Sequence, residues 1–490
     1  MTSRAFLTAA SFAALLTGCA VGPDYERPAG PADASYDSAP SPSATTKADV
    51  HGGDVQTFSA GADVPGEWWT LFRSPALDSL IRQALASNPD LKAADAALRQ
   101  ARELAAADHG ALLPSVDATG NQQRERLSAA QTGIPGYAPI YNLTTAQVTV
   151  SYNVDVFGGT RRTIEASEAA AEYQRWQREA QVLTLTANVV ATALQEASLR
   201  AQIAATQQII DAETHQLDVI KRQFDLGGAS KNDILSQESL LAQNRAALPA
   251  LQRQLDQQRH LLATLVGNSP SQGSGAAFEL DKLSLPTDLP LTLPVKLVEQ
   301  RPDIQAAQAT LHQASALVGV AVANRYPKLN LSADIGSAAI DGAKFFTDGS
   351  SFWSIGAGLT APIFHGDTLE HQQNAAEAAL DQAAAQYQST VLNALRNVAD
   401  TLRALQTDAE ALARQVDAEN AAAASLDLAK QRYEYGAISY LTLLDAERTE
   451  AQTHINLIQA QAARFTDTAA LLQALGGGWW NRPDMTPKGA

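Results

Sequence analysis

The sequence predicts an α+β membrane protein that is internally duplicated, with few β-strands in each chain and unusually long helices. Three observations predict this class: two copies of one pattern, a pair of alternating segments in each copy, and long stretches without glycine or proline. The chain of 490 residues has a formal net charge of -16, and 45% of its residues are hydrophobic. An acidic chain is a poor candidate for nucleic-acid binding, so no nucleic-acid partner is expected.

The N-terminus is typical of an exported protein. Arg4 precedes an apolar stretch over 5–16, which is too short to span a bilayer as a stable helix. The short sequence LTG then precedes Cys19, the only cysteine of the chain. This ending resembles the lipobox of bacterial lipoproteins, which implies removal of residues 1–18 and attachment of S-diacylglycerol and N-palmitoyl groups to Cys19. The alternative is a free cysteine in an ordinary signal peptide.

Two copies of one pattern follow. NPDLKAADAALRQA at 88–101 matches RPDIQAAQATLHQA at 301–314, an offset of 213 residues. LDVIKRQFDLGGASKNDIL at 217–235 matches LDLAKQRYEYGAISYLTLL at 426–444, an offset of 209 residues. These offsets exceed the periods of solenoid repeats, so they indicate a duplicated half-molecule.

The predicted domains follow from these offsets and from composition. A segment rich in Pro, Ser and Ala, without a sustained period, predicts an extended tether ahead of the first repeat. The domains are a signal peptide over 1–18, the lipidated tether over 19–65, a first repeat over 66–285, a second repeat over 286–478 and a tail over 479–490.

Each repeat begins with a helix and continues with a β-hairpin. Pro89 and Pro302 stand where the first turn of a helix tolerates proline, and the second of these helices is expected over 302–326. The hairpins are expected at about 114–157 and 327–364. In VTVSYNVDVF and LNLSADIG, apolar and polar residues alternate, a pattern typical of transmembrane β-strands. Soluble β-hairpins show the same alternation and are the alternative.

A long helix and a shorter return helix complete each repeat. Neither glycine nor proline occurs over 160–226 or over 367–435, and a helix of that length would be roughly 100 Å long. Gly227, Gly228 and Gly436 follow and are expected to form the turns at the hairpin tips. The return helices are expected over 231–266 and 440–475.

Four strands in one chain cannot close a transmembrane barrel, because single-chain barrels begin at eight strands and open edges are excluded from lipid. No run of 18 consecutive apolar residues follows the N-terminal stretch. Either the strands lie outside a membrane, or strands from several chains share one barrel. Three chains would supply twelve strands, and their long helices would form a tube on the periplasmic side.

Segments along nearly the whole mature chain resemble the outer membrane efflux protein family, in the lipoprotein branch of TolC-like channels that serve RND multidrug pumps. These segments are LTGCAVGPDYERP, WWTLFRSPALDSLIRQALASNPDL, YNVDVFGG, RPDIQAAQATL, YPKLNLSADIG, APIF, RYEYGAISYLTLLDAERT and ALGGGW. The resemblance implies a homotrimer in the outer membrane of a Gram-negative bacterium. It also implies a twelve-stranded barrel, a periplasmic α-helical tunnel, and lipid anchoring through Cys19.

The resemblance further implies a passive exit duct for drugs or other small toxic compounds. Its partners would be a periplasmic membrane-fusion adaptor protein, an inner-membrane RND pump and outer-membrane lipid. Two alternatives remain open: a secretion duct for peptides or proteins, and a lipid-anchored coiled-coil scaffold that spans the periplasm without conducting.

The resemblance also implies a gate at the tip of the second helix hairpin, where the helices expected over 367–435 and 440–475 meet. Arg432 and Tyr433 would lie near the constriction, and Leu441 and Asp445 would line it. The last two are four residues apart and therefore share a helical face. In a trimer they would form an apolar ring that restricts passage and an acidic ring that disfavours anions. The alternative for Asp445 is a surface ion pair with Arg448.

The first helix hairpin, formed by the helices expected over 160–226 and 231–266, lacks these residues. Phe224, Asn232 and Ser236 stand where the second hairpin has tyrosine, leucine and aspartate. We therefore expect one hairpin to gate and the other to pack or bind the adaptor.

The sequence predicts neither an enzyme nor a catalytic, cofactor or metal site. The closest histidine pair, His365 and His371, is six residues apart and misses the i, i+4 spacing of two ligands on one helical face. No P-loop or nucleophile elbow occurs. Energy for opening a duct would have to come from a partner.

Overall fold

The structure, a computed structural model, describes residues 20–31, 35–36 and 43–482. The predicted signal peptide and Cys19 lie outside these residues. The chain divides into two compact units, which are described separately. The sheet unit comprises residues up to Pro28, Ala97–Gln174 and Ala306–Tyr387; the helical unit comprises Ala29–Ala96, Arg175–Gln305 and the residues from Gln388 onward.

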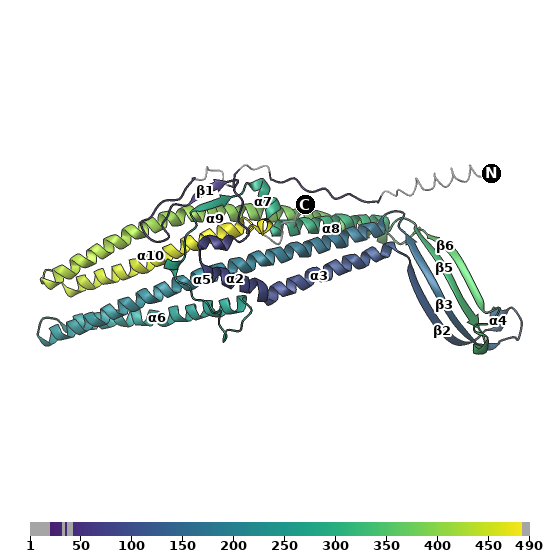
Figure 1. Cartoon of the computed structure of the whole chain (residues 1–490), viewed down its shortest axis with the longest axis horizontal. Helices are drawn as coiled ribbons and strands as arrows, with labels where there is room; N and C mark the ends of the chain where they lie inside the picture. Colours follow the sequence, from purple (N-terminus) through teal and green to yellow (C-terminus); the bar gives the residue numbers. More distant parts are fainter. Residues whose placement is uncertain (1–19, 32–34, 37–42, 483–490) are drawn as a thin grey trace. The chain divides into compact units, whose positions relative to one another are not determined.

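The sheet unit contains one antiparallel four-stranded sheet in the order β2-β3-β5-β6 (Figure 1). Two β-hairpins that lie far apart in the chain supply the strands, as the alternating segments predicted. A short helix, α4, lies between β2 and β3. The bounds are β2 Ser115–Arg126, α4 Ala129–Thr132, β3 Ile140–Val154, β5 Lys328–Ala339 and β6 Ser351–Thr360.

Long helices precede and follow these strands in the chain. The helix α5 and the helix α9 each have 67 residues. The shorter helices α6 and α10 follow them, and each has 35 residues. The bounds are α3 Pro89–His109, α5 Gly159–Asp225, α6 Lys231–Leu265, α8 Pro302–Ala323, α9 Thr368–Glu434 and α10 Tyr440–Ala474.

The helix expected over 302–326 ends earlier, at Ala323. Arg325 N donates to Val322 O and Tyr326 N to Ala323 O, so the chain tightens into turns before Pro327. A proline disfavours helical backbone in the residue before it, which explains why the prediction placed this end too late.

In the helical unit, the hairpin α5/α6 and the hairpin α9/α10 lie side by side (Figure 1). Smaller elements complete this unit: β1 Thr57–Ala60, α2 Pro75–Ser87, β4 Asp288–Leu291 and α7 Pro294–Gln300. Strands β1 and β4 pair in parallel as a two-stranded sheet.

The extended tether predicted over 19–65 was wrong for residues 43–65. Strand β1 lies within it, and Gln56 and Val64 are fully buried. Gln56 Nε2 donates to Pro286 O at 2.8 Å and to Thr468 Oγ1 at 2.9 Å. Composition alone missed this because contacts with residues more than 200 positions away order the segment.

One window of α5 is long and apolar enough to cross a membrane by length and composition. Within the described residues, 72% of that window is buried inside the protein. Burial of this extent is what a core helix of a helical bundle shows, so the window carries little weight as a membrane span.

Candidate functional site

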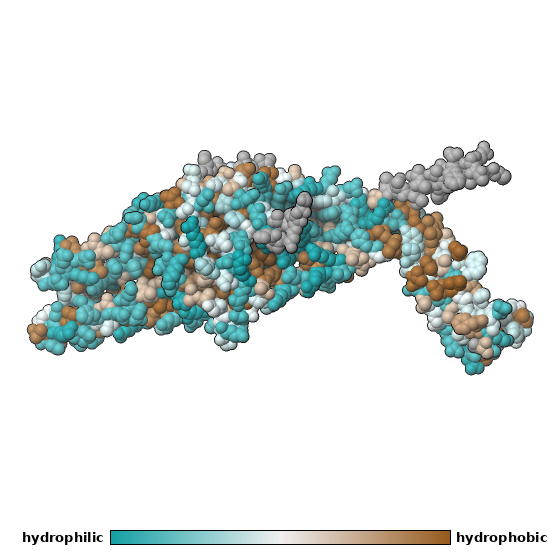
Figure 2. Space-filling view, in the orientation of Figure 1, coloured by the Kyte–Doolittle hydropathy of each residue, from teal (hydrophilic) through white to brown (hydrophobic). Residues whose placement is uncertain are grey.

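The two faces of the four-stranded sheet differ in polarity. Strand register places Val148 opposite Ala118 and Ile335, and Ile335 opposite Trp353, so apolar side chains share one face. Trp353 is 74% exposed, and Ile355 on the same strand is 79% exposed. Figure 2 shows hydrophobic residues gathered over this sheet. The apolar face is uncovered in the single chain, which is a poor arrangement for a surface in water.

Polar side chains occupy the other face. Register aligns Asp117, Thr149, Asp334 and Ser354 in one row across the four strands. Thr149 Oγ1 donates to Asp334 Oδ1 at 2.6 Å, and Ser354 Oγ donates to Asp334 Oδ2 at 3.0 Å. A sheet with one lipid-compatible face and one hydrated face is typical of an outer-membrane barrel wall.

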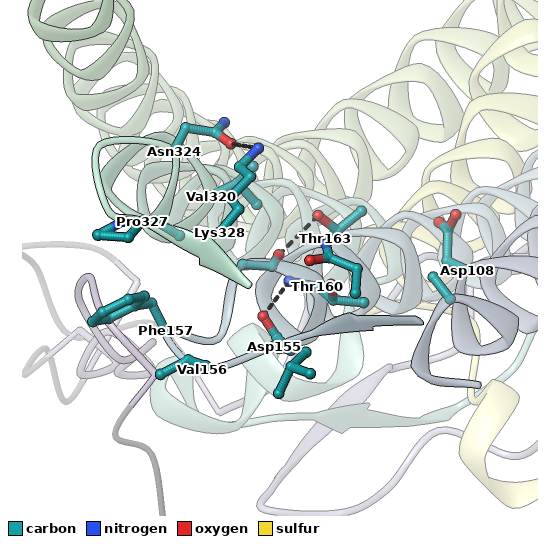
Figure 3. A pocket seen from close by; sticks show the side chains of 15 residues that line it. Asp108, Asp155, Val156, Phe157, Thr160, Thr163, Val320, Asn324, Pro327 and Lys328 are labelled. Carbon is teal, nitrogen blue, oxygen red and sulfur yellow. Dashed lines mark hydrogen bonds between the residues drawn. The ribbon is translucent and has the colours of Figure 1, made fainter. Parts of the chain in front are cut away.

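The start of α5 is fixed by a carboxylate that follows β3. Asp155 accepts hydrogen bonds from Thr160 N at 2.9 Å and from Arg161 N at 3.0 Å. A negative group at a helix N-terminus satisfies its free amides and its dipole. Figure 3 shows Asp155 at the edge of a pocket that also contains Lys328 and Asn324, which are joined by a hydrogen bond of 3.1 Å.

Few titratable side chains line this junction. Its titratable side chains are Asp108, Asp155 and Lys328. Among the described residues, no group of three or more His, Cys, Asp or Glu side chains could hold a metal ion. The observed contacts of Asp155 join the end of β3 to the start of α5.

The segment that follows the predicted lipid attachment residue is docked on the sheet unit. Arg162 is buried and donates to Val21 O at 3.3 Å and to Asp24 Oδ1 at 2.7 Å. Gly22 lies so close to Gly319 that a Cβ at Gly22 would be 2.4 Å from Gly319 Cα. The residues directly after position 19 have no regular secondary structure, but they are held against the sheet unit, which the prediction of an extended tether did not include.

The turns at the two hairpin tips have the same hydrogen bonds. Gly227 and Gly436 adopt left-handed backbone, with φ of +79° and +69°. Gly228 N donates to Gln223 O at 2.7 Å, and Ala437 N makes the equivalent bond to Arg432 O at 2.8 Å. This is the Schellman pattern, in which only the first glycine requires a left-handed conformation.

The side chains expected at the gate lie in two places. Arg432 and Asp445 line one groove between α9 and α10. Leu441 is half exposed, one turn of α10 before Asp445. Tyr433 instead reaches the other hairpin, where its hydroxyl donates to Gln223 Oε1 at 3.0 Å. Arg448, the alternative partner of Asp445, donates to Gln243 Oε1 at 3.2 Å.

Sequence reasoning missed a set of polar residues buried between the hairpins. Tyr440, Gln237 and Glu213 lie within an apolar cluster formed by all four helices. Gln237 stands three residues from both Ile234 and Leu240, which belong to that cluster. A glutamine at an apolar position of the helical period was the available indication.

The geometry defines a class. A sheet with one apolar and one polar face, in which each β-hairpin is followed in the chain by a helix hairpin with arms of 67 and 35 residues, is the architecture of an outer-membrane channel. A family model described as outer membrane efflux protein matches residues 80–268 and 293–477. The chain belongs to the outer membrane efflux protein family.

Known relatives agree over nearly the full length. The chain is 30% identical to the antibiotic efflux pump outer membrane protein ArpC of Pseudomonas putida, over 99% of this chain and all of ArpC. It is 32% identical to the pyoverdine export outer membrane protein OpmQ of Pseudomonas aeruginosa, over 84% of this chain and 87% of OpmQ. The solved outer-membrane channel OprN superposes with a TM-score of 0.85 at 27% identity, covering 94% of this chain and all of OprN.

These similarities establish an outer-membrane efflux protein. Its location is the outer membrane, and its role is efflux transport through a channel. The family model and the solved relative both describe efflux channels.

Proposed function

We propose that this chain forms the exit duct of a tripartite RND-type efflux system. Drugs or other small toxic compounds would pass through it passively, from a periplasmic pump to the exterior. The observation that carries the proposal is the sheet with one exposed apolar face, in a chain of the efflux family. The antibiotic and pyoverdine transport named for two relatives supports small molecules as cargo.

Three copies of the chain would close one barrel of twelve strands. The four-stranded sheet leaves β2 and β6 as edge strands, and unpaired edges are excluded from lipid. The two stretches matched by the family model are offset by 213 residues at their starts and 209 at their ends, as in the repeated segments. Together with the equal helix lengths, this supports a duplicated chain and an approximate sixfold arrangement in the trimer.

The hairpin tips would form the periplasmic gate and meet the adaptor. Leu441 and Asp445 would supply an apolar and an acidic ring, with Arg432 beside Asp445 in the groove between α9 and α10. An adaptor that binds the open tip more tightly would shift the equilibrium toward the open state. Cys19 would carry the lipid, as a second attachment to the outer membrane.

Planar-bilayer recording of the purified full-length protein, with the mass of its oligomer, tests the proposal. We expect a trimer that conducts ions. A monomer without conductance would contradict the duct. A trimer without conductance, even with the gate residues replaced by alanine, would favour the periplasm-spanning scaffold.

A further inference from the structure

The interface between the two helix hairpins contains polar side chains removed from water. Gln237 is 0% exposed, Tyr440 is 4% exposed and Glu213 is 5% exposed. Their neighbours are apolar side chains of all four helices, including Ile220, Leu240 and Leu443. Burial of polar groups in such surroundings is costly unless they are hydrogen-bonded, so each of these groups is expected to have a hydrogen-bond partner.

A chain of hydrogen bonds joins the hairpins at this point. The Tyr440 hydroxyl on α10 donates to Gln237 Oε1 on α6. Gln237 Nε2 donates to the main-chain oxygen of Glu213 on α5 at 3.0 Å. Asn244 Nδ2 donates to Glu213 Oε1 at 2.6 Å. We call Tyr440, Gln237 and Glu213 the latch, since they connect three helices of two hairpins.

We propose that Tyr440 and Gln237 are positioning residues for the gate. The latch holds α10 on the hairpin α5/α6 and thereby fixes the rotation of α10. Leu441 follows Tyr440 directly and is half exposed, so burial of one residue directs the other away from the interface. Opening of the duct requires the Tyr440–Gln237 bond to break. This inference rests on the proposed channel function.

The residues of the latch have no counterparts at the equivalent positions of the other repeat. The helices of the two repeats align at a constant offset of 209 residues. At this offset the positions equivalent to Tyr440, Gln237 and Glu213 hold Lys231, Ala446 and Ala422. An approximately sixfold tunnel built from three chains would therefore carry three latches, at alternate hairpin interfaces.

Two carboxylates make the latch sensitive to pH. Glu213 and Glu447 each have a buried Oε2 without a hydrogen-bond partner in the described structure. Burial raises the pKa of Glu447 to about 7; Lys430 opposes this shift and the Glu213 charge adds to it. Burial also raises the pKa of Glu213, against the Asn244 hydrogen bond and the charges of Arg448 and Arg245.

The charged groups around this interface come from every helix packed there. They are Glu213 on α5, Asp233 and Arg245 on α6, Lys430 on α9, and Glu447 and Arg448 on α10.

The sign of the pH effect follows from the raised pKa values. In the closed packing these carboxyls bind protons more tightly than in a loosened, hydrated tip, where their pKa would approach the ordinary glutamate value of about 4.5. The stability of the closed packing is therefore complete at low pH and declines as pH rises from about 4.5 to about 7. We expect basal conductance to rise over the same interval.

Bilayer recording of the full-length protein tests the latch with matched variants. Tyr440→Phe removes one hydroxyl and should raise the basal open fraction about two- to tenfold, since one buried hydrogen bond is lost. Tyr435→Phe removes the same group from an exposed tip residue and should change nothing. Equal open fractions in the two variants would overturn the proposal.

The pH profile separates a latch from a merely structural contact. Glu447→Gln should flatten the rise of conductance between pH 4.5 and 7. Glu238→Gln changes the repeat-equivalent residue, which is paired with Lys221 at 3.3 Å, and should retain the rise. An unchanged profile in Glu447→Gln would contradict the role of the carboxylates.

Hydrogen exchange does not depend on conductance, so it tests the latch proposal separately from the channel proposal. Hydrogen exchange of the α10 amides should quicken in Tyr440→Phe, and in the unaltered protein it should quicken as pH rises, after correction for intrinsic rates. If no variant conducts, the channel proposal fails, and the exchange data still decide the latch. Equal exchange rates of the α10 amides in Tyr440→Phe and Tyr435→Phe would refute the latch.

Discussion

Gly436 illustrates how one residue determines a hairpin tip. Its φ of +69° is left-handed, yet a Cβ added there would meet no atom within 4 Å. The cost of Gly436→Ala is therefore conformational and should be about 1 kcal/mol in local stability. Hydrogen exchange of the amides at the α9/α10 tip measures this loss.

The neighbouring hairpin provides the control. The backbone of Gly228 is outside the left-handed region. A Cβ added at Gly228 would lie 3.5 Å from the main-chain oxygen of Gln223, which is an ordinary contact distance. The equivalent residue in the second repeat is already alanine, Ala437. Gly228→Ala should therefore leave tip exchange unchanged, and a loss equal to that of Gly436→Ala would contradict the argument.

The proposed gate is also tested at the scale of residues. Leu441→Ala combined with Asp445→Ala should raise basal conductance, because it removes both the apolar and the acidic ring. The matched control is Asn232→Ala with Ser236→Ala, at the equivalent positions of the first hairpin. Low conductance in both double variants would count against the gate, and high conductance in both would contradict the asymmetry.

At the scale of elements, the N-terminal segment is a strap that Arg162 holds to the sheet unit. Arg162→Gln should weaken docking of residues 21–24 by about 1–3 kcal/mol, because it removes charged hydrogen bonds from a buried site. Limited proteolysis of the purified protein should then cut this segment faster. Arg161→Gln alters an exposed neighbour, and equal cutting of both variants would contradict the role of Arg162.

The helices show which parts of an element a local pattern determines. The absence of glycine and proline predicted the two long helices within one residue of the observed ends, and Gly227 and Gly436 predicted their turns. The strap, the strands β1 and β4 and the early end of α8 were not predicted. These features depend on partners that are distant in the chain or on the geometry of a following proline.

At the scale of the whole molecule, the two faces of the sheet predict opposite effects for neighbouring substitutions. Ile355→Lys places a charge on the apolar face and should cost about 2–4 kcal/mol in a bilayer. Ser354→Lys places the same charge on the polar face and should assemble normally. The amount of trimer in isolated outer membranes measures the difference, and equal assembly of both variants would contradict the proposed barrel.

The sequence by itself determined the kinds, order and ends of most elements, because hydrophobic period, glycine and proline act within a few residues of where they stand. It also determined the family, since its matching segments extend over the chain. Only the tertiary structure decided which residues meet: Tyr440 and Gln237 are 203 positions apart, and Arg162 and Asp24 are 138 apart. Such contacts depend on how whole helices pack, and no local pattern encodes that packing.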